Sequence, residues 1–106
     1  MLARRNRVST ALVSHIMKEG VSVHTPSMSL RFTLRAAYPR FSAIVSKKVA
    51  KTAVERNRTR RRVYAVLEKL ALPPLHGLIM IKKSISTISP RELTEEINNL
   101  LAKVRQ

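Results

Sequence analysis

The sequence predicts an α+β domain in which helices pack on a four-stranded sheet. Residues 28–34 alternate between apolar and polar side chains, which is the pattern of a strand with one buried face. Two longer segments, one before Pro73-Pro74 and one near the C-terminus, instead repeat apolar residues at helical spacing. The expected order is helix, three strands, helix, strand, helix (α-β-β-β-α-β-α). No repeat or long linker divides the sequence, so residues 1–106 are expected to form a single domain.

The first helix is expected to be capped by Ser9 or Thr10 and to run to about Glu19. Gly20 follows at the position where a helix commonly ends on a left-handed residue. The apolar residues of this helix share one face: Leu12, Val13, Ile16 and Met17. Residues 21–23 then form a short strand, followed by a turn and the alternating strand.

Two more strands follow from the pattern. Tyr38-Pro39 marks a turn, and residues 41–46 form a strand that we expect to pair in antiparallel fashion with residues 28–34. Residues 78–81 are apolar throughout, which indicates a short buried strand.

The last helix has a complete start signal. Ser89 provides the cap, Pro90 takes the first helical position and Glu92 completes a capping box. The helix is expected to run to about residue 104. The side chains on its inward face are Leu93, Ile97, Leu100, Leu101 and Val104.

Charge is the strongest indication of function. The chain has 21 Lys and Arg residues against 6 acidic ones, a formal net charge of +15. Solubility needs a net charge of only about 2–8 in a small domain, and this much like charge opposes folding through self-repulsion. The excess predicts a polyanionic partner. We expect RNA, because the sequence has no apolar run long enough to span a membrane and no motif of the common DNA-binding folds.

Basic residues concentrate at the start of the long helix, which begins near residues 48–52, persists to about Leu70 and ends at Pro73-Pro74. Between residues 47 and 62 a single acid, Glu55, accompanies eight basic residues: Lys47, Lys48, Lys51, Arg56, Arg58, Arg60, Arg61 and Arg62. A solvated helix face normally mixes charges of both signs. Guanidinium groups bind phosphate in bidentate fashion and stack on exposed bases, so this helix is the candidate RNA-binding site.

Helical geometry sorts these side chains. The expected inward stripe consists of Thr59, Val63, Val66 and Leu70. Asn57 and Arg61 then point away from the core, with Arg58 and Arg60 beside them. Arg56 and Arg62 lie nearer the buried edge. Asn57 is placed to read a base edge or to fix an arginine.

At this segment the sequence resembles the protein component of bacterial ribonuclease P. The matching stretches are Ser46-Lys47-Lys48-Val49-Ala50-Lys51 and Ala53-Val54-Glu55-Arg56-Asn57-Arg58-Thr59-Arg60-Arg61. They are similar to the family's Ser-Lys-Lys strand end and its Arg-Asn-Arg helix. The likeness extends to the flanks: Asn6-Arg7-Val8, Lys18-Glu19-Gly20, the strand ending at Lys83 and the last helix.

The resemblance implies a left-handed β-α-β crossover around the basic helix. It also implies a function: supporting a Mg²⁺-dependent catalytic RNA that removes the 5′ leader from precursor tRNA. The partners would be that RNA and precursor tRNA, with neither membrane nor DNA involved. The RNA-binding role is transferred to Arg56, Asn57, Arg58, Arg60 and Arg61, with Lys47, Lys48 and Lys51 in support. The absence of Cys suits a reducing cytosol, and we expect a cytoplasmic protein.

The family also has a cleft between its first helix and the sheet, where aromatic side chains help to hold the leader. Val13 and Met17 stand where the resemblance implies an aromatic pair on the helix, so leader contact is either weaker here or apolar and shape-based. Phe32 is a leader-cleft candidate or a core residue. Tyr64 and Arg62 also depart from the family pattern. Tyr64 either stacks on a base or packs against its surroundings.

The protein is not expected to perform chemistry itself. Metal-dependent cleavage needs clustered carboxylates, and the sequence has no Asp. The acids Glu92, Glu95 and Glu96 open the last helix, where the helix dipole favours them. The three histidines lie on different predicted elements: His15, His24 and His76. We therefore expect no catalytic residue, and no metal or other cofactor bound by protein side chains.

Two alternatives remain open from the sequence alone. A structural RNA-binding protein, such as a ribosomal protein, would have the same charge and no processing role. Residues 1–18 are rich in Arg and Ser and contain no acid, which is also the composition of a mitochondrial transit peptide.

Overall fold

A computed structural model describes residues 10–33 and 38–104. The elements are α1 (Thr10–Glu19), β1 (Val21–His24), β2 (Met28–Thr33), β3 (Arg40–Val45), α2 (Ala53–Lys69), β4 (His76–Ile81) and α3 (Pro90–Val104). This order confirms the predicted one. The expectations for Asn6-Arg7-Val8, for a Ser9 cap and for Leu34 concern positions outside the described residues. The same holds for residues 1–9 of the segment with transit-peptide composition, whereas residues 10–18 of that segment lie in α1.

The sheet has the strand order β1-β2-β4-β3. The β1–β2 and β2–β4 pairs are antiparallel, and the β3–β4 pair is parallel. The predicted antiparallel pairing of residues 41–46 with residues 28–34 is therefore wrong, because β4 lies between these strands. β4 is apolar and covered on both faces, as Leu78 and Ile79 show with 0% exposure each, and such a strand belongs at the centre of a sheet. The segment β3-α2-β4 is a parallel β-α-β unit. The left-handed sense of its crossover connection stays a prediction.

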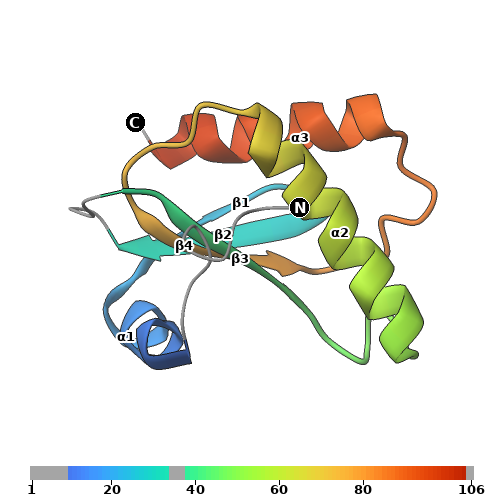
Figure 1. Cartoon of the computed structure of the whole chain (residues 1–106), viewed down its shortest axis with the longest axis horizontal. Coiled ribbons are helices and arrows are strands. Elements are labelled where there is room, and N and C mark those ends of the chain that lie inside the picture. The colour runs from blue at the N-terminus through green and yellow to red at the C-terminus, as the bar shows by residue number, and fades with distance from the viewer. Residues whose placement is uncertain (1–9, 34–37, 105–106) are drawn as a thin grey trace.

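The sheet separates two layers of helix (Figure 1): α2 and α3 cover one face, and α1 lies on the other. The main core fills the α2/α3 side. Its members on β2 and β3 are Met28, Leu30, Phe32, Phe41, Ala43 and Val45. Ile16 is fully buried outside this cluster and anchors α1. The highly charged helix α2 therefore packs its apolar side on the sheet.

The helix boundaries agree with local capping. The Thr52 hydroxyl accepts a hydrogen bond from the Glu55 backbone N–H at 3.1 Å, and Ser89 accepts one from Glu92 at 3.1 Å. Of the predicted α2 stripe, Val63 and Val66 are buried. Thr59 and Leu70 are only half-buried, and Tyr64 and Leu67 complete the buried face. On α3 the predicted inward residues are buried up to position 101, and Val104 is half-buried.

The C-terminus of α1 is held without a left-handed residue. Gly20 lies outside the left-handed region, so that expectation is wrong. Its N–H donates to the Ile16 carbonyl oxygen at 2.8 Å, and a Cβ at this position would lie 2.4 Å from the same oxygen. Glycine is required by close approach instead. Arg31 of β2 also donates to the α1 carbonyls, from Nε to Ile16 at 3.2 Å and to Met17 at 3.0 Å.

Candidate RNA-binding site

On the outer face of α2, the side chains of Asn57, Arg58 and Arg61 are exposed. Within residues 10–33 and 38–104, neither Arg58 nor Arg61 has a hydrogen bond or an ion pair. Arg60 is half-buried and donates to the Asn57 side-chain oxygen. Of the two roles open to Asn57, the structure shows the fixing of an arginine. Two guanidinium groups are thus free to meet a partner, and a third is oriented along the helix.

The other two arginines of α2 turn inward. Arg56 Nη1 donates to the carbonyl oxygens of Ala50 at 3.1 Å and Lys51 at 3.2 Å. Arg62 donates to the carbonyl oxygens of Ile85 and Ile88 in the segment between β4 and α3. Arg56 therefore braces the entry to α2, and Arg62 joins α2 to the β4–α3 segment. Both lie near the buried edge, as helical geometry predicts.

The supporting lysines lie in the turn between β3 and α2. Lys47, Lys48 and Lys51 are exposed, and the Ser46 carbonyl oxygen accepts from the N–H groups of Val49 and Ala50, each at 3.1 Å. The three lysines precede the N-terminal end of α2, where the helix dipole is also positive.

A second lysine pair lies at the same end of the sheet, and the sequence analysis missed it. Val45 of β3 is in register with Ile81 of β4, so two parallel strands end side by side. Each runs into exposed lysines, at positions 47–48 after β3 and at Lys82 and Lys83 after β4. The signal was present as a Lys-Lys pair after each strand. Only the parallel pairing brings the two pairs to one edge.

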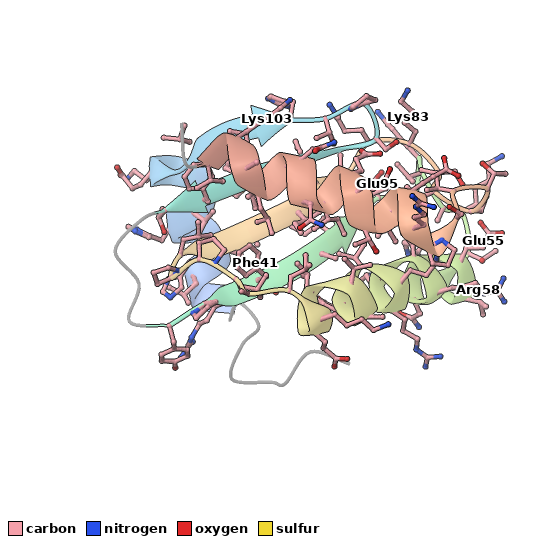
Figure 2. The ribbon with its side chains drawn as sticks, turned by 90° about the horizontal axis from the view of Figure 1, so that it is seen from above. Phe41, Glu55, Arg58, Lys83, Glu95 and Lys103 are labelled. Atoms are coloured by element: carbon pink, nitrogen blue, oxygen red, sulfur yellow. The ribbon has the colours of Figure 1, made fainter. Side chains whose placement is uncertain are left out.

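A groove of about 410 Å³ lies between α2 and the β4–α3 segment. Its wall on α2 includes Arg58 and Arg62, and its opposite wall includes Ser84 and Ser86. In Figure 2, Arg58 and Lys83 lie at the same end of the molecule, with the start of α3 between them in this view. The basic surface therefore extends from α2 across a groove toward the end of β4.

Two acidic residues of α3 make contacts within the protein. Glu96 accepts hydrogen bonds from the Thr25 hydroxyl at 2.7 Å and the Ser27 backbone N–H at 2.9 Å, which fastens α3 to the β1–β2 turn. Glu95 pairs with Arg91 at 3.4 Å on the exposed surface of α3. Among the described residues, no group of three or more His, Cys, Asp or Glu residues is placed to hold a metal ion.

The candidate leader-cleft residues do not lie together. Val13 is half-buried on α1 and Met17 is 46% exposed. Phe32 is 6% exposed and belongs to the main core, on the sheet face that α2 and α3 cover. Tyr64 is buried to the same degree, and its hydroxyl accepts a hydrogen bond from the Ala43 backbone N–H at 3.1 Å. Neither aromatic ring is available for stacking on a base.

Within the described part of the chain, no helix is both long and apolar enough to cross a membrane. The helices α2 and α3 each bury one apolar side in the core.

Comparison with known proteins identifies the family. Residues 2–105 match the sequence model of the family described as Ribonuclease P. The chain is 34% identical over 83 residues to the ribonuclease P protein component of Pseudanabaena sp., covering 74% of this chain and 71% of the relative. It is 33% identical over 97 residues to the component of Synechococcus elongatus, covering 83% and 80%.

Solved structures share the fold. The RNase P protein from Thermotoga maritima superposes with a TM-score of 0.80 at 20% identity, covering 92% of this chain and 96% of that one. The RNase P protein of Staphylococcus aureus superposes with a TM-score of 0.77 at 18% identity, covering 95% of each chain. With a sequence match over residues 2–105 and relatives above 30% identity, the chain belongs to the ribonuclease P protein family.

Proposed function

We propose that the chain is the protein subunit of ribonuclease P, and that it supports a catalytic RNA in removing the 5′ leader from precursor tRNA. Family membership supports the role. The observation that carries the mode of action is that Arg58 and Arg61 are exposed and have no partner within residues 10–33 and 38–104. The RNA supplies the chemistry and its Mg²⁺ ions. The protein supplies charge and positioning, in the cytoplasm where its tRNA substrates are made.

The basic surface is proposed to face the catalytic RNA. Arg58 and Arg61 contact phosphates or bases directly, because nothing in the described part of the protein competes for their donors. Asn57 holds Arg60 for the same purpose. Arg56 contributes charge while it braces the turn at Ala50. The exposed lysines extend the surface: Lys47, Lys48, Lys51, Lys82 and Lys83.

Precursor tRNA is proposed as the second partner, with its single-stranded leader beside α1. Val13 and Met17 contribute apolar contact there, since both have exposed surface on α1. Phe32 contributes to the fold rather than to the leader site, because its ring is in the main core.

The test is cleavage of a precursor tRNA at low Mg²⁺ by a bacterial ribonuclease P RNA, with and without the protein. We expect cleavage at the mature 5′ end to be restored by the protein and to be absent when the protein is added without RNA. Tight binding to the same RNA without restored cleavage would contradict the proposal and favour a structural RNA-binding protein. Cleavage by the protein alone would also contradict it.

A further inference from the structure

Two exposed serines, Ser84 and Ser86, lie in the segment between β4 and α3. Ile85 between them is 1% exposed and belongs to the main core, so it anchors the segment. Both serines line the groove of about 410 Å³ that faces α2. Arg62 of α2 also holds the segment, because it donates to the carbonyl oxygens of Ile85 and Ile88. The two hydroxyl groups are therefore held on one wall of the groove.

The hydroxyl oxygen of Ser84 already has donors around it. It accepts a hydrogen bond from the Ser86 backbone N–H at 3.3 Å. The hydroxyl oxygens of Ser84 and Ser86 lie 3.0 Å apart and share a second hydrogen bond. A phosphate ester at Ser84 would bring three strong acceptor oxygens to a place where a backbone donor, a hydroxyl group and the adjacent Lys83 are present.

The opposite wall of the groove contains a guanidinium group that can reach such a phosphate. Arg58 and Arg62 of α2 both line the groove, and Glu55 is the acid in its lining. Arg62 is occupied by the carbonyl oxygens of the segment, whereas Arg58 has no hydrogen bond or ion pair within residues 10–33 and 38–104. The lining thus has an excess of positive charge, and Arg58 has donors available for a bidentate contact with phosphate.

Ser84 is also accessible to an enzyme. It is exposed and lies after the end of β4, outside the helices and strands. Two exposed lysines, Lys82 and Lys83, precede it directly. A modifying enzyme with an acidic substrate groove would be complementary to this charge. Figure 2 shows Lys83 at the end of the molecule where Glu55 and Arg58 of α2 also lie.

We propose that Ser84 is a phosphorylation site, and that its phosphate binds Arg58 across the groove and lowers the affinity of the basic surface for RNA. A protein kinase would transfer the γ-phosphoryl group of a nucleoside triphosphate. The Ser84 oxygen forms the new bond to phosphorus, the bond from phosphorus to the β–γ bridging oxygen breaks, and nucleoside diphosphate and a proton are released. The phosphate has a charge of about −1.5 to −2 at neutral pH.

Two effects then act in the same direction. The phosphate occupies the donors of Arg58, and its negative charge repels the phosphates of an approaching RNA. The effect on RNA binding rests on the proposed function, in which α2 faces the catalytic RNA. The bridge between Ser84 and Arg58 lies within the protein and does not depend on that function, so each can be tested separately.

The bridge is tested on the full-length protein without RNA. Phosphoserine is incorporated in place of Ser84 by an expanded genetic code. In the matched control it replaces Thr87, which is exposed on the same segment but does not line the groove. Phosphorus NMR then measures the second pKa of each phosphate. Arg58→Ala should raise this pKa at position 84, because the arginine favours the dianion, and should leave it unchanged at position 87. No rise at position 84 would overturn the proposal.

The effect on function is measured as binding to ribonuclease P RNA. The two phosphoproteins have the same charge, so general repulsion is matched. We expect phosphate at position 84 to weaken binding about tenfold more than phosphate at position 87, the equivalent of one hydrogen bond to a charged group. In the Arg58→Ala background the two positions should weaken binding equally, because the contact that the bridge removes is already absent. Equal weakening in the parent would overturn the proposal. If the unmodified parent failed to bind this RNA, the proposed function would fail, and the NMR titration would still decide the bridge.

An unmodified variant tests whether the groove instead holds a phosphate of the RNA. Ser84→Ala should leave RNA binding unchanged, because the Ser84 hydroxyl is bonded within its own segment. Weaker binding by this variant would assign the groove to the RNA and overturn the proposal.

Mass spectrometry of the protein isolated from its own cells tests whether the modification occurs. We expect a fraction of the molecules from growing or starved cultures to have phosphate on Ser84. Its absence from both cultures would overturn the assignment of Ser84 as a phosphorylation site.

Discussion

The Tyr64 hydroxyl accepts a hydrogen bond from the backbone N–H of Ala43 at 3.1 Å, across the contact between α2 and β3. Tyr64 is buried against the sheet, while Arg58 and Arg61 of the same helix are exposed. Together with the buried Val63, Val66 and Leu67, this contact holds one face of α2 against the protein. Arg58 and Arg61 lie on the other side.

Tyr64→Phe should therefore lower the free energy of unfolding by about 1 kcal/mol, the usual net value of one hydrogen bond. Urea denaturation measures it. Tyr38→Phe is the matched control, since Tyr38 is exposed and removal of its hydroxyl should cost much less. Equal losses in the two variants would mean that the buried hydroxyl contributes nothing particular to the fold.

The double variant Arg58→Ala/Arg61→Ala should weaken binding to ribonuclease P RNA and leave the melting temperature unchanged, because neither side chain has a partner in the described part of the protein. The dependence of affinity on salt should also become less steep, by about one unit of slope for each phosphate that the variant no longer neutralises. The parent, which we expect to neutralise about six phosphates or more, should bind on the order of 10³ more weakly at moderate salt than at low salt. Unchanged affinity at moderate salt would refute the assignment of this face.

Arg62 should behave differently from Arg61, although the two are neighbours in sequence. Its guanidinium donates to the carbonyl oxygens of Ile85 and Ile88, which Arg62→Met would leave without these donors. We expect a loss of about 1.5–3 kcal/mol in unfolding free energy, the range for a hydrogen bond from a charged group. Arg61→Met is the control and should be nearly neutral. Faster amide hydrogen exchange at Ile88 in the Arg62 variant alone would locate the effect.

The elements of this fold could be predicted because their signals are local. Alternation in residues 28–34, the Ser89 cap and the Pro73-Pro74 stop each depend on a few neighbouring residues. The strand order could not be predicted in the same way. Insertion of β4 between β2 and β3 joins segments more than 30 residues apart, and no local pattern encodes that pairing.

The candidate site likewise has features that local sequence predicts and features that depend on tertiary packing. The exposed side of α2 follows from helical periodicity, so the positions of Asn57, Arg58 and Arg61 were predictable. Tyr64 was ambiguous because a tyrosine has an apolar ring and a polar hydroxyl, and its buried partner is a backbone group on another element. His15 and His76 are far apart in sequence, and only the packing of α1 on the sheet brings them together.

The surroundings of His76 should make the stability of the protein depend on pH. Burial, then Arg40 and His15, lower the pKa of His76 from its ordinary value of 6.5, because each disfavours the charged imidazolium. Folding therefore favours the neutral form. This contribution to stability is present above about pH 6.5 and is lost as the pH falls toward the lower pKa of the folded state. His76→Gln should make stability less dependent on pH across this window.

Arg40→Met offers a direct check on the cause. Removing the cation should raise the pKa of His76, as measured by NMR titration of its imidazole protons. Arg91→Met, on the distant surface of α3, is the control and should leave that titration unchanged. An unchanged titration in the Arg40 variant would leave burial and His15 as the groups responsible.

Lys82 and Lys83 test whether the basic surface extends beyond α2. They are exposed at the end of β4, beside the strand end that leads into Lys47, and Lys82 is fixed through its backbone N–H to the Ser27 carbonyl oxygen at 2.8 Å. The variant Lys82→Ala/Lys83→Ala keeps that backbone bond. It should weaken binding to ribonuclease P RNA and lower the salt slope by about two units if each lysine meets one phosphate. Lys69→Ala, at the opposite end of α2, is the matched control and should do neither. If the two sets of variants weaken binding by the same amount per charge, the RNA senses only the net charge of the protein, and the parallel strand ends form no specific contact.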